Sequence, residues 1–354
     1  MKPELTCSQM ADEMLTASMR VLWLRPTTGK NISVGRERIA EHLERSGVTV
    51  DVRDATGWDA VDAARAAFVG RYDAIVGTAR AGLYVGYPLA VLGRLGFVAD
   101  IADPIDQIRD LPDLLFRTFN WYELSVLRRT SQRAAVYEST RNRLAAHGLS
   151  TTPVENGVDF DKFADPEASV VRQTESILTE AGVDVDKPIA MYVGGLSTTY
   201  YLFDILGASE RCSDWQFVFL GEGPLAEMLR DASNELENVF YPGSFDYDLI
   251  PGFLSHASSG LCLVGIEQPL KVLEYGAAGL PTVGMHGGLS DRFSEDQLLF
   301  VDPSPESVAT ALDDLRTDPS LAKKYGENLR EEAKRHSWSD IADIYYELLE
   351  ASLS

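Results

Sequence analysis

Residues 20–52, RVLWLRPTTGKNISVGRERIAEHLERSGVTVDV, decide the fold class of this chain. The apolar run at residues 20–24 predicts a buried strand, and the amphipathic stretch at residues 34–46 predicts a helix. Gly47 then separates this helix from a second apolar run at residues 48–52, which predicts a second strand. A strand, a helix and a strand in this order predict a βαβ unit with parallel strands.

The same alternation continues along the chain and then starts again. In the first half, further strands are predicted at residues 73–77, 98–101 and 134–137, and helices at 87–95 and 111–129. After an acidic stretch at residues 165–187, interpreted as a linker, strands are predicted at 188–193, 215–220, 239–241, 260–264 and 282–284. Two α/β halves, each with a doubly wound parallel sheet, are therefore expected. Such folds bind ligands at the carboxyl ends of their strands.

The composition excludes some classes of function. With 354 residues, of which 45% are hydrophobic, the chain is long enough for two domains with separate cores. Its formal net charge of −22 leaves no general basic surface for a phosphodiester backbone, so nucleic-acid binding is not expected. The excess of acidic residues, with Arg used more often than Lys, resembles the composition of halophilic proteins.

Neither a disulfide framework nor a targeting segment is predicted. Cys7, Cys212 and Cys262 are far apart and show no C-x-x-C spacing, so no zinc site is indicated either. Residues 1–18 lack the basic and apolar regions of a signal peptide and are interpreted as a tail. The apolar stretch at residues 81–93 is too short to span a bilayer, so a protein that is soluble or sits on a membrane surface is expected. The cysteine pattern fits a reducing cytosol and thus predicts a cytoplasmic protein.

The densest chemical signal is IEQPLKVLEYGAAGLP at residues 266–281. An apolar strand here runs into a loop and then a helix, and the free N–H groups at a helix start suit a diphosphate. Glu274, one turn into this helix, is placed to accept two hydrogen bonds from a vicinal diol such as a ribose. The alternative is an amphipathic helix on which Glu267 and Glu274 are solvated.

With these residues the chain resembles the retaining glycosyltransferases of family four, which have the GT-B fold. The resemblance extends over roughly residues 19–350, and its further motifs occur in the family's order: Asn156-Gly157-Val158-Asp159 with Phe163, Tyr192-Val193-Gly194-Gly195-Leu196-Ser197, Leu220-Gly221-Glu222-Gly223-Pro224, and Trp338 before a final helix. It implies two Rossmann-like domains facing across a cleft. Residues 19–165 would form the acceptor domain, with residues 338–354 packing back on it, and residues 166–337 the nucleotide-sugar domain.

The resemblance also implies roles for individual residues. Glu274 would hold the nucleotide ribose, and Glu267 would contact the donor sugar as a catalytic residue, although six residues separate these acids instead of the family's seven. The other donor-binding candidates are Lys271, Gly194, Gly195, Ser197, Gly221, Pro269 and Leu270. The Arg and Lys that the family places after the Gly-rich turn are missing, because Gly195 and residues 198–201 occupy those positions. Lys271 is the candidate that would supply a positive charge instead, or else it is a solvated surface residue.

The first half and two loops supply weaker candidates. The loop at residues 26–35 is expected near the donor phosphates and acceptor, with Asn31 and Gly35 as candidates, but it lacks a P-loop pattern. Asp103 follows a predicted strand and would either orient an acceptor hydroxyl or stabilise a turn. His286, in a loop after a strand, would face the cleft or pack the loop. Three D-x-D spacings, at residues 159–161, 184–186 and 246–248, are attributed to the acidic composition, and no metal site is predicted.

Residues 109–143 oppose the general acidity. They combine several arginines with aromatic residues, namely Arg117, Arg128, Arg129, Arg133 and Arg141 with Phe116, Phe119, Trp121 and Tyr122. This combination suits a peripheral contact with the inner face of a membrane or a phosphate-bearing acceptor. The alternative is a solvated helix with a buried aromatic face.

The sequence thus predicts a metal-independent glycosyltransferase without a cofactor, which moves a sugar from a nucleotide-sugar donor to a hydroxyl acceptor. The acceptor would be a glycan, a lipid carrier or a small molecule, and retention of anomeric configuration is implied by the resemblance. Two alternatives stay open. A nucleotide-sugar epimerase has the same architecture, and a non-catalytic nucleotide-sugar-binding relative would explain the missing Arg and Lys.

Overall fold

The computed structural model describes residues 19–26, 30–102, 105–109 and 111–354, which form two compact units. Unit 1 contains the chain up to Glu155 together with Trp338–Ser354, and unit 2 is Asn156–Ser337. The chain therefore divides before the boundary expected at residue 165. The expected return of the last helix to the first half is present, because Trp338–Ser354 belongs to unit 1.

Unit 1 is built on a sheet of six parallel strands in the order β2-β1-β3-β4-β5-β6. The strands are β1 (Arg20–Arg25), β2 (Thr49–Asp54), β3 (Ala74–Thr78), β4 (Gly96–Ile101), β5 (Gln132–Ala135) and β6 (Thr152–Pro153). Every residue of β3 and β4 is buried, as expected for central parallel strands that helices cover on both faces.

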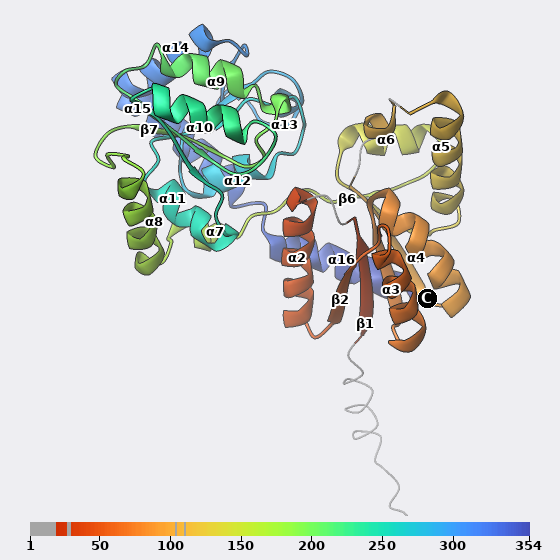
Figure 1. The fold of residues 1–354 in the computed structure, drawn as a ribbon. Coiled ribbons are helices and arrows are strands. Elements are labelled where there is room, and N and C mark those ends of the chain that lie inside the picture. The colour runs from red at the N-terminus through yellow and green to blue at the C-terminus, as the bar shows by residue number, and fades with distance from the viewer. Residues whose placement is uncertain (1–18, 27–29, 103–104, 110) are drawn as a thin grey trace, which may run out of the picture. The chain divides into compact units, whose positions relative to one another are not determined.

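Helices cover both faces of this sheet (Figure 1). They are α2 (Lys30–Arg45), α3 (Asp59–Val69), α4 (Ala79–Gly93), η1 (Ile105–Ile108), α5 (Asp113–Leu127), α6 (Glu138–Ala146) and α16 (Trp338–Ser352). Right-handed crossovers place α2 on one face, where it contacts α16, and α3, α4 and α5 on the other face. In the second layer α3 contacts α4, and α4 contacts α5.

A buried ion pair links helix α2 to the sheet of unit 1. Arg36 on α2 donates from Nε and Nη2 to both carboxylate oxygens of Asp100 on β4, at 2.8 and 2.7 Å. The same carboxylate accepts hydrogen bonds from the hydroxyl groups of Thr78, at 2.6 Å, and Tyr345, at 2.7 Å. Asp100 is completely buried, and these four donor atoms compensate for the loss of water around its charge.

Unit 2 has a second sheet of six parallel strands, in the order β12-β11-β10-β7-β8-β9. Its strands are β7 (Ile189–Val193), β8 (Gln216–Leu220), β9 (Val239–Gly243), β10 (Ser259–Cys262), β11 (Thr282–Met285) and β12 (Leu299–Val301). Its helices are α7 (Phe160–Ala164), α8 (Ala168–Glu180), η2 (Thr198–Tyr200), α9 (Leu202–Ser209), α10 (Ala226–Glu235), η3 (Tyr247–Leu249), α11 (Ile250–Ser255), α12 (Leu270–Ala277), α13 (Gly288–Arg292), α14 (Pro305–Thr317) and α15 (Pro319–Ala333). The expectation of two doubly wound α/β halves is confirmed.

Three local predictions are wrong. The expected linker contains α8, whose apolar side buries Leu178 and packs against α11, so its acidic residues are only the solvated face of a helix. The helix expected to begin at residue 87 begins at Ala79, with Pro88 inside it. The expected loop at residues 26–35 becomes α2 at Lys30, while residues 27–29 lie outside the described part.

Candidate active site

The strand order of unit 2 locates its candidate ligand-binding edge. The chain passes from β7 to β8 and β9 on one side and then crosses over to β10, which pairs with the other side of β7. The connections that follow β7 and β10 therefore leave in opposite directions. In open α/β sheets this switch point leaves a crevice at the carboxyl ends of the strands. Residues 194–197 follow β7, and residues 263–269 lead from β10 into α12.

Glycines allow the turns at this edge to approach each other. Gly194 and Gly221 have φ values of +135° and +143°, which L side chains rarely adopt. A Cβ at Gly221 would lie 1.9 Å from the carbonyl oxygen of Gly194, and one at Gly223 would lie 2.3 Å from that of Leu196. The two turns are also joined by a backbone hydrogen bond of 2.8 Å from Leu196 to Glu222. The turns of the two predicted Gly-rich motifs therefore pack against each other through their backbone atoms.

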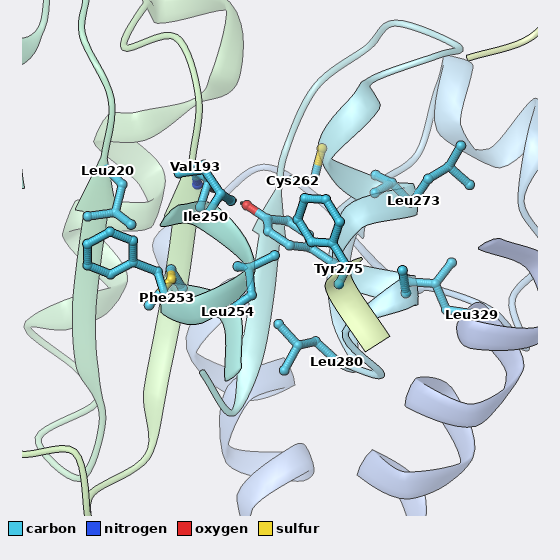
Figure 2. Close-up of a cluster of buried hydrophobic side chains, with 14 of the residues drawn as sticks. Val193, Leu220, Ile250, Phe253, Leu254, Cys262, Leu273, Tyr275, Leu280 and Leu329 are labelled. Atoms are coloured by element: carbon cyan, nitrogen blue, oxygen red, sulfur yellow. Dashed lines mark hydrogen bonds between the residues drawn. The ribbon is translucent and has the colours of Figure 1, made fainter. Parts of the chain in front are cut away.

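Helix α12 is fixed above this edge by the residue after Glu274. Tyr275 is completely buried, and its hydroxyl oxygen accepts a 2.9 Å hydrogen bond from the backbone N–H of Val193 at the end of β7. Figure 2 shows the Tyr275 ring within the apolar core, with its oxygen directed at Val193. Gly260 leaves room for that ring, because a Cβ there would lie 2.4 Å from it. This contact fixes the helical register that places Glu274 and Lys271.

Glu274 is buried, and its Oε1 accepts a 2.8 Å hydrogen bond from the hydroxyl group of Tyr247. Burial raises the pKa of this carboxyl from 4.5 to about 7; Tyr247 and Lys271 oppose the rise, and the charge of Asp159 adds to it. Near neutral pH this carboxyl is therefore partly protonated. The solvated alternative for Glu274 is excluded by its burial.

Lys271 lies on the same helix and is also buried. Its Nζ is 3.9 Å from the ring centroid of Tyr192 and 4.0 Å from that of Tyr200, so the two rings hold the ammonium by cation–π attraction. Within the described residues, no atom accepts a hydrogen bond from Nζ. A Cβ on Gly194 would lie 2.8 Å from this nitrogen. Burial lowers the pKa of Lys271 from 10.5 to about 8.

The loop before α12 is held from several directions. Gln268 is buried; its backbone oxygen accepts a 2.8 Å hydrogen bond from Asn156, and its side-chain oxygen accepts one from Arg292. Pro269 is buried at the N-cap, where its side chain makes no capping hydrogen bond, and Leu270 begins the helix half-buried. Glu267 is half-buried in this loop, and Ser197, also half-buried, precedes η2.

The remaining candidates lie elsewhere. Gly35 is inside α2, where a Cβ would lie 2.9 Å from the Trp338 ring, so its small size serves helix packing. Asn31 is in the first turn of α2, and Asp103 lies outside the described residues. His286 is exposed and stacks on Phe300, with 5.2 Å between ring centroids. His286 is the member of this group in unit 2, and it is not in the Lys271–Glu274 cluster.

Sequence reasoning missed the three tyrosines that surround the two charged groups. Tyr247 is the middle residue of a D-x-D spacing that was set aside as a chance match, and its hydroxyl reaches Glu274. Tyr192 and Tyr200 flank Lys271, and Tyr192 also donates a 2.6 Å hydrogen bond to the Gly195 carbonyl. The signal in the sequence was Tyr200, which lies in the run at residues 198–201, where the family has a basic residue. Throughout the described ranges, no group of three or more His, Cys, Asp or Glu side chains is placed to hold a metal ion.

The arginine and aromatic segment is divided by the fold. Arg133 and Arg141 donate hydrogen bonds to backbone carbonyls and are structural. By contrast, Arg117 and Arg128 are exposed, together with Phe119 and Trp121, whereas Phe116 and Tyr122 are half-buried. Arg129 is exposed as well, and its Nη1 donates a 2.8 Å hydrogen bond to the backbone carbonyl of Ser125. The solvated-helix interpretation thus accounts for part of this segment only.

Comparison with known proteins points to the same region of the chain. Residues 173–332 match the family model for glycosyl transferases group 1. Sulfoquinovosyl transferase SQD2 of Arabidopsis thaliana is 27% identical over 191 residues, which cover 51% of this chain and 36% of that protein. Alpha-maltose-1-phosphate synthase of Mycolicibacterium smegmatis is 23% identical over 260 residues, which cover 66% of each chain. The chain thus spans less than two thirds of either relative's own length.

Solved structures resemble nearly the whole chain. HepE of Anabaena, solved in complex with UDP-glucose, has a TM-score of 0.75 at 16% identity over 94% of this chain and 100% of that one. Sucrose-phosphate synthase of Thermosynechococcus elongatus has a TM-score of 0.74 at 18% identity, with the same coverage. At these identities the likeness shows the fold alone. The chain therefore has the GT-B fold, and its residues 173–332 match the family model for glycosyl transferases group 1.

Proposed function

We propose that the chain is a glycosyltransferase that moves a sugar from a nucleotide-sugar donor to a hydroxyl acceptor. The observation that carries this proposal is the pairing of Glu274 and Lys271 on α12, both buried and both at the switch-point edge of unit 2. A carboxylate and an unbonded ammonium one turn apart match the two polar parts of a nucleoside diphosphate, the ribose diol and the phosphates. The UDP-glucose bound in HepE, which has this fold, is a donor of this class.

In this proposal Lys271 replaces the missing Arg and Lys. The diphosphate would lie over the turn formed by Gly194, Gly195 and Gly221, and the first N–H groups of α12, at Leu270 and Lys271, would face its charge. Because these donors are already in place, they would stabilise the negative charge that develops as the diphosphate leaves.

The finer assignments also belong to this proposal. Glu267 would contact the donor sugar next to Pro269, Ser197 would donate to the phosphates, and Asp103 would orient the acceptor hydroxyl. Transfer would proceed with retention and without a metal ion, as the resemblance to family four implies. An epimerase would need catalytic acids and a histidine near the donor. His286 stacks on Phe300 outside the Lys271–Glu274 cluster, which favours transfer over epimerisation.

The acceptor side is proposed from unit 1. A peripheral membrane contact through residues 109–143 at the inner face would give the enzyme access to a lipid-linked or other phosphate-bearing acceptor. The exposed Arg128 and Arg129 suit such a contact. In the described ranges, no helix combines the length and the apolar character that a bilayer crossing requires.

Calorimetric titration of the Glu274→Gln variant with a nucleoside diphosphate tests the proposal. The amide keeps one acceptor but offers the diol a donor, so the affinity is expected to fall roughly ten- to hundred-fold. The matched control is Glu327→Gln, an exposed carboxylate on α15 of the same unit, which should bind as the parent does. An unchanged affinity in Glu274→Gln, with a normal melting temperature, would mean that α12 is purely structural.

A further inference from the structure

The layer formed by α3, α4 and α5 carries an unusual apolar surface. Ten of the fourteen exposed large apolar side chains among the described residues belong to these helices or to the residue that precedes α3. The ten are Trp58, Val61, Phe68, Val69, Val91, Leu92, Leu114, Leu115, Phe119 and Trp121. Because α4 contacts both α3 and α5, these side chains belong to one continuous layer, which Figure 1 shows on one side of the unit 1 sheet.

The charge of this layer opposes that of the whole chain. When the residues that flank the three helices are included, the exposed arginines among the described residues are Arg65, Arg71, Arg94, Arg109, Arg117, Arg128 and Arg129, and the exposed acids are Asp59, Asp62, Asp73 and Asp113. The chain as a whole has a formal net charge of −22. A basic and apolar surface on such an acidic protein is complementary to an anionic, apolar partner.

A cavity of about 240 Å³ opens where α4 and α5 end. Its wall includes Arg94, Arg129, Ser131, Tyr87 and the apolar Val91. Arg94 adopts a left-handed conformation at the C-cap of α4, and Leu92, two residues earlier, is 71% exposed. Two arginines in one wall suit a phosphate, and the adjacent apolar side chains suit acyl chains.

We propose that the α3–α4–α5 surface docks on a bilayer of anionic phospholipids, with a headgroup phosphate in the cavity between Arg94 and Arg129. The inference extends the membrane contact of the proposed function from residues 109–143 to all three helices and names its lipid class. The exposed tryptophans suit this lipid surface, because tryptophan is enriched at the interface between water and acyl chains. Trp58 and Trp121 are 87% and 65% exposed, whereas Trp23, Trp215 and Trp338 are buried.

This division of the tryptophans makes the contact measurable. Acrylamide is a neutral quencher, and it should reach Trp58 and Trp121 but not the three buried rings. Vesicles of phosphatidylglycerol and phosphatidylcholine should therefore protect most of the accessible fluorescence, and vesicles of phosphatidylcholine alone should protect much less of it. Co-sedimentation with the same vesicles measures the affinity directly.

Two variants and a control test the assignment. Leu92→Asp and Leu114→Asp should each weaken vesicle binding about tenfold, because an acid replaces a side chain that enters the acyl region. Phe203→Asp changes an exposed apolar residue of α9 in unit 2 and should bind vesicles as the parent does. Arg94→Ser with Arg129→Ser should remove the preference for phosphatidylglycerol and leave the melting temperature unchanged.

Other outcomes would overturn the inference. Absence of binding to any vesicle, or equal losses in Phe203→Asp and Leu92→Asp, would remove the lipid surface. Protection from acrylamide that grows with protein concentration in the absence of vesicles would show instead that a second copy covers this layer. Calorimetric titration of the same variants with a nucleoside diphosphate separates the two proposals, since donor binding in unit 2 should stay unchanged whether or not vesicles bind.

Discussion

Replacement of Lys271 by methionine is expected to weaken the binding of a nucleoside diphosphate roughly ten- to hundred-fold and to leave binding of the free nucleoside unchanged. The Lys271 ammonium is held by the rings of Tyr192 and Tyr200, and none of the described atoms accepts a hydrogen bond from it. A phosphate oxygen would supply the missing acceptor. Hydrogen bonds to charged groups contribute about 1.5–3 kcal/mol, and about 1.4 kcal/mol corresponds to a tenfold change in affinity.

The same substitution should leave the fold almost as stable. Burial lowers the pKa of Lys271 from 10.5 to about 8, which corresponds to a cost of about 3 kcal/mol for keeping its charge in the folded unit. Methionine removes this cost and also removes two cation–π contacts, each of which contributes about 2 kcal/mol when desolvated. The two changes nearly cancel. The melting temperature is therefore expected to stay within about 4 °C of the parent value.

The pH dependence of nucleotide affinity follows from the same groups. Above about pH 8 Lys271 loses its positive charge, and below about pH 7 Glu274 takes up a proton and loses acceptor capacity. Affinity for the diphosphate should therefore be highest between about pH 7 and about pH 8 and fall on both sides. Lys271→Met should abolish the fall above about pH 8 and keep the fall below about pH 7. Calorimetric titrations from about pH 6 to about pH 9, in buffers of different ionisation enthalpy, also report the protons exchanged.

The matched control is Lys323→Met, which removes an exposed lysine from α15 of the same unit. It should bind the nucleoside diphosphate as the parent does. Full diphosphate affinity in a folded Lys271→Met protein, or an equal loss for the diphosphate and the nucleoside, would refute the phosphate-binding role of Lys271.

Further predictions concern metal dependence, folding and stability. Sugar transfer should persist in excess chelator; loss of activity with EDTA that Mn²⁺ or Mg²⁺ restores would reveal a metal site. Gly221→Ala should prevent normal folding of unit 2, because the added Cβ would lie 1.9 Å from the Gly194 carbonyl oxygen, whereas Gly265→Ala meets no atom within 4 Å and should give a normal circular dichroism spectrum. Asp100→Leu should lower the free energy of unfolding by about 3–5 kcal/mol by leaving Arg36 buried without its partner, and adding Arg36→Met should recover part of that loss in urea titrations. Because the pKa of Glu274 is raised from 4.5 to about 7, its contribution to the free energy of unfolding is fully present below about pH 4.5 and is lost by about pH 7. Glu274→Gln should therefore make the melting temperature less dependent on pH in this range, which thermal unfolding at a series of pH values would show.

Much of the fold could be predicted from the sequence because its strands are buried on both faces. Such strands appear in the sequence as continuous apolar runs, as in residues 189–193. Their prediction does not require a decision about which side chains face the core and which face solvent. The amphipathic α8 was missed for the opposite reason: its acidic face dominates the composition of residues 165–187. The turn at Gly194 and the helix containing Glu274 were identified by their motifs.

The surroundings of these residues could not be predicted, because they depend on contacts between distant parts of the chain. Tyr247 reaches Glu274 from a separate element, η3, and Tyr192 reaches Lys271 from a strand far earlier in the sequence. No local sequence pattern predicts such contacts between residues that are far apart in the chain. Burial likewise decides between the two interpretations of Lys271. Its spacing alone allowed a solvated lysine, whereas packing against the rings of Tyr192 and Tyr200 shields its ammonium from solvent.

The return of α16 to unit 1 has a consequence for how the chain is made. Asp100, the partner of Arg36, accepts a hydrogen bond from Tyr345 on α16, and Gly35 packs against Trp338 on the same helix. One side of the core of unit 1 therefore stays uncovered until α16 has been synthesised. Unit 2 is continuous in sequence and has all its strands before that helix leaves the ribosome. The half that is synthesised second is thus the first able to finish folding. The half that is synthesised first must wait for α16, and until then its charged pair is open to water on one side.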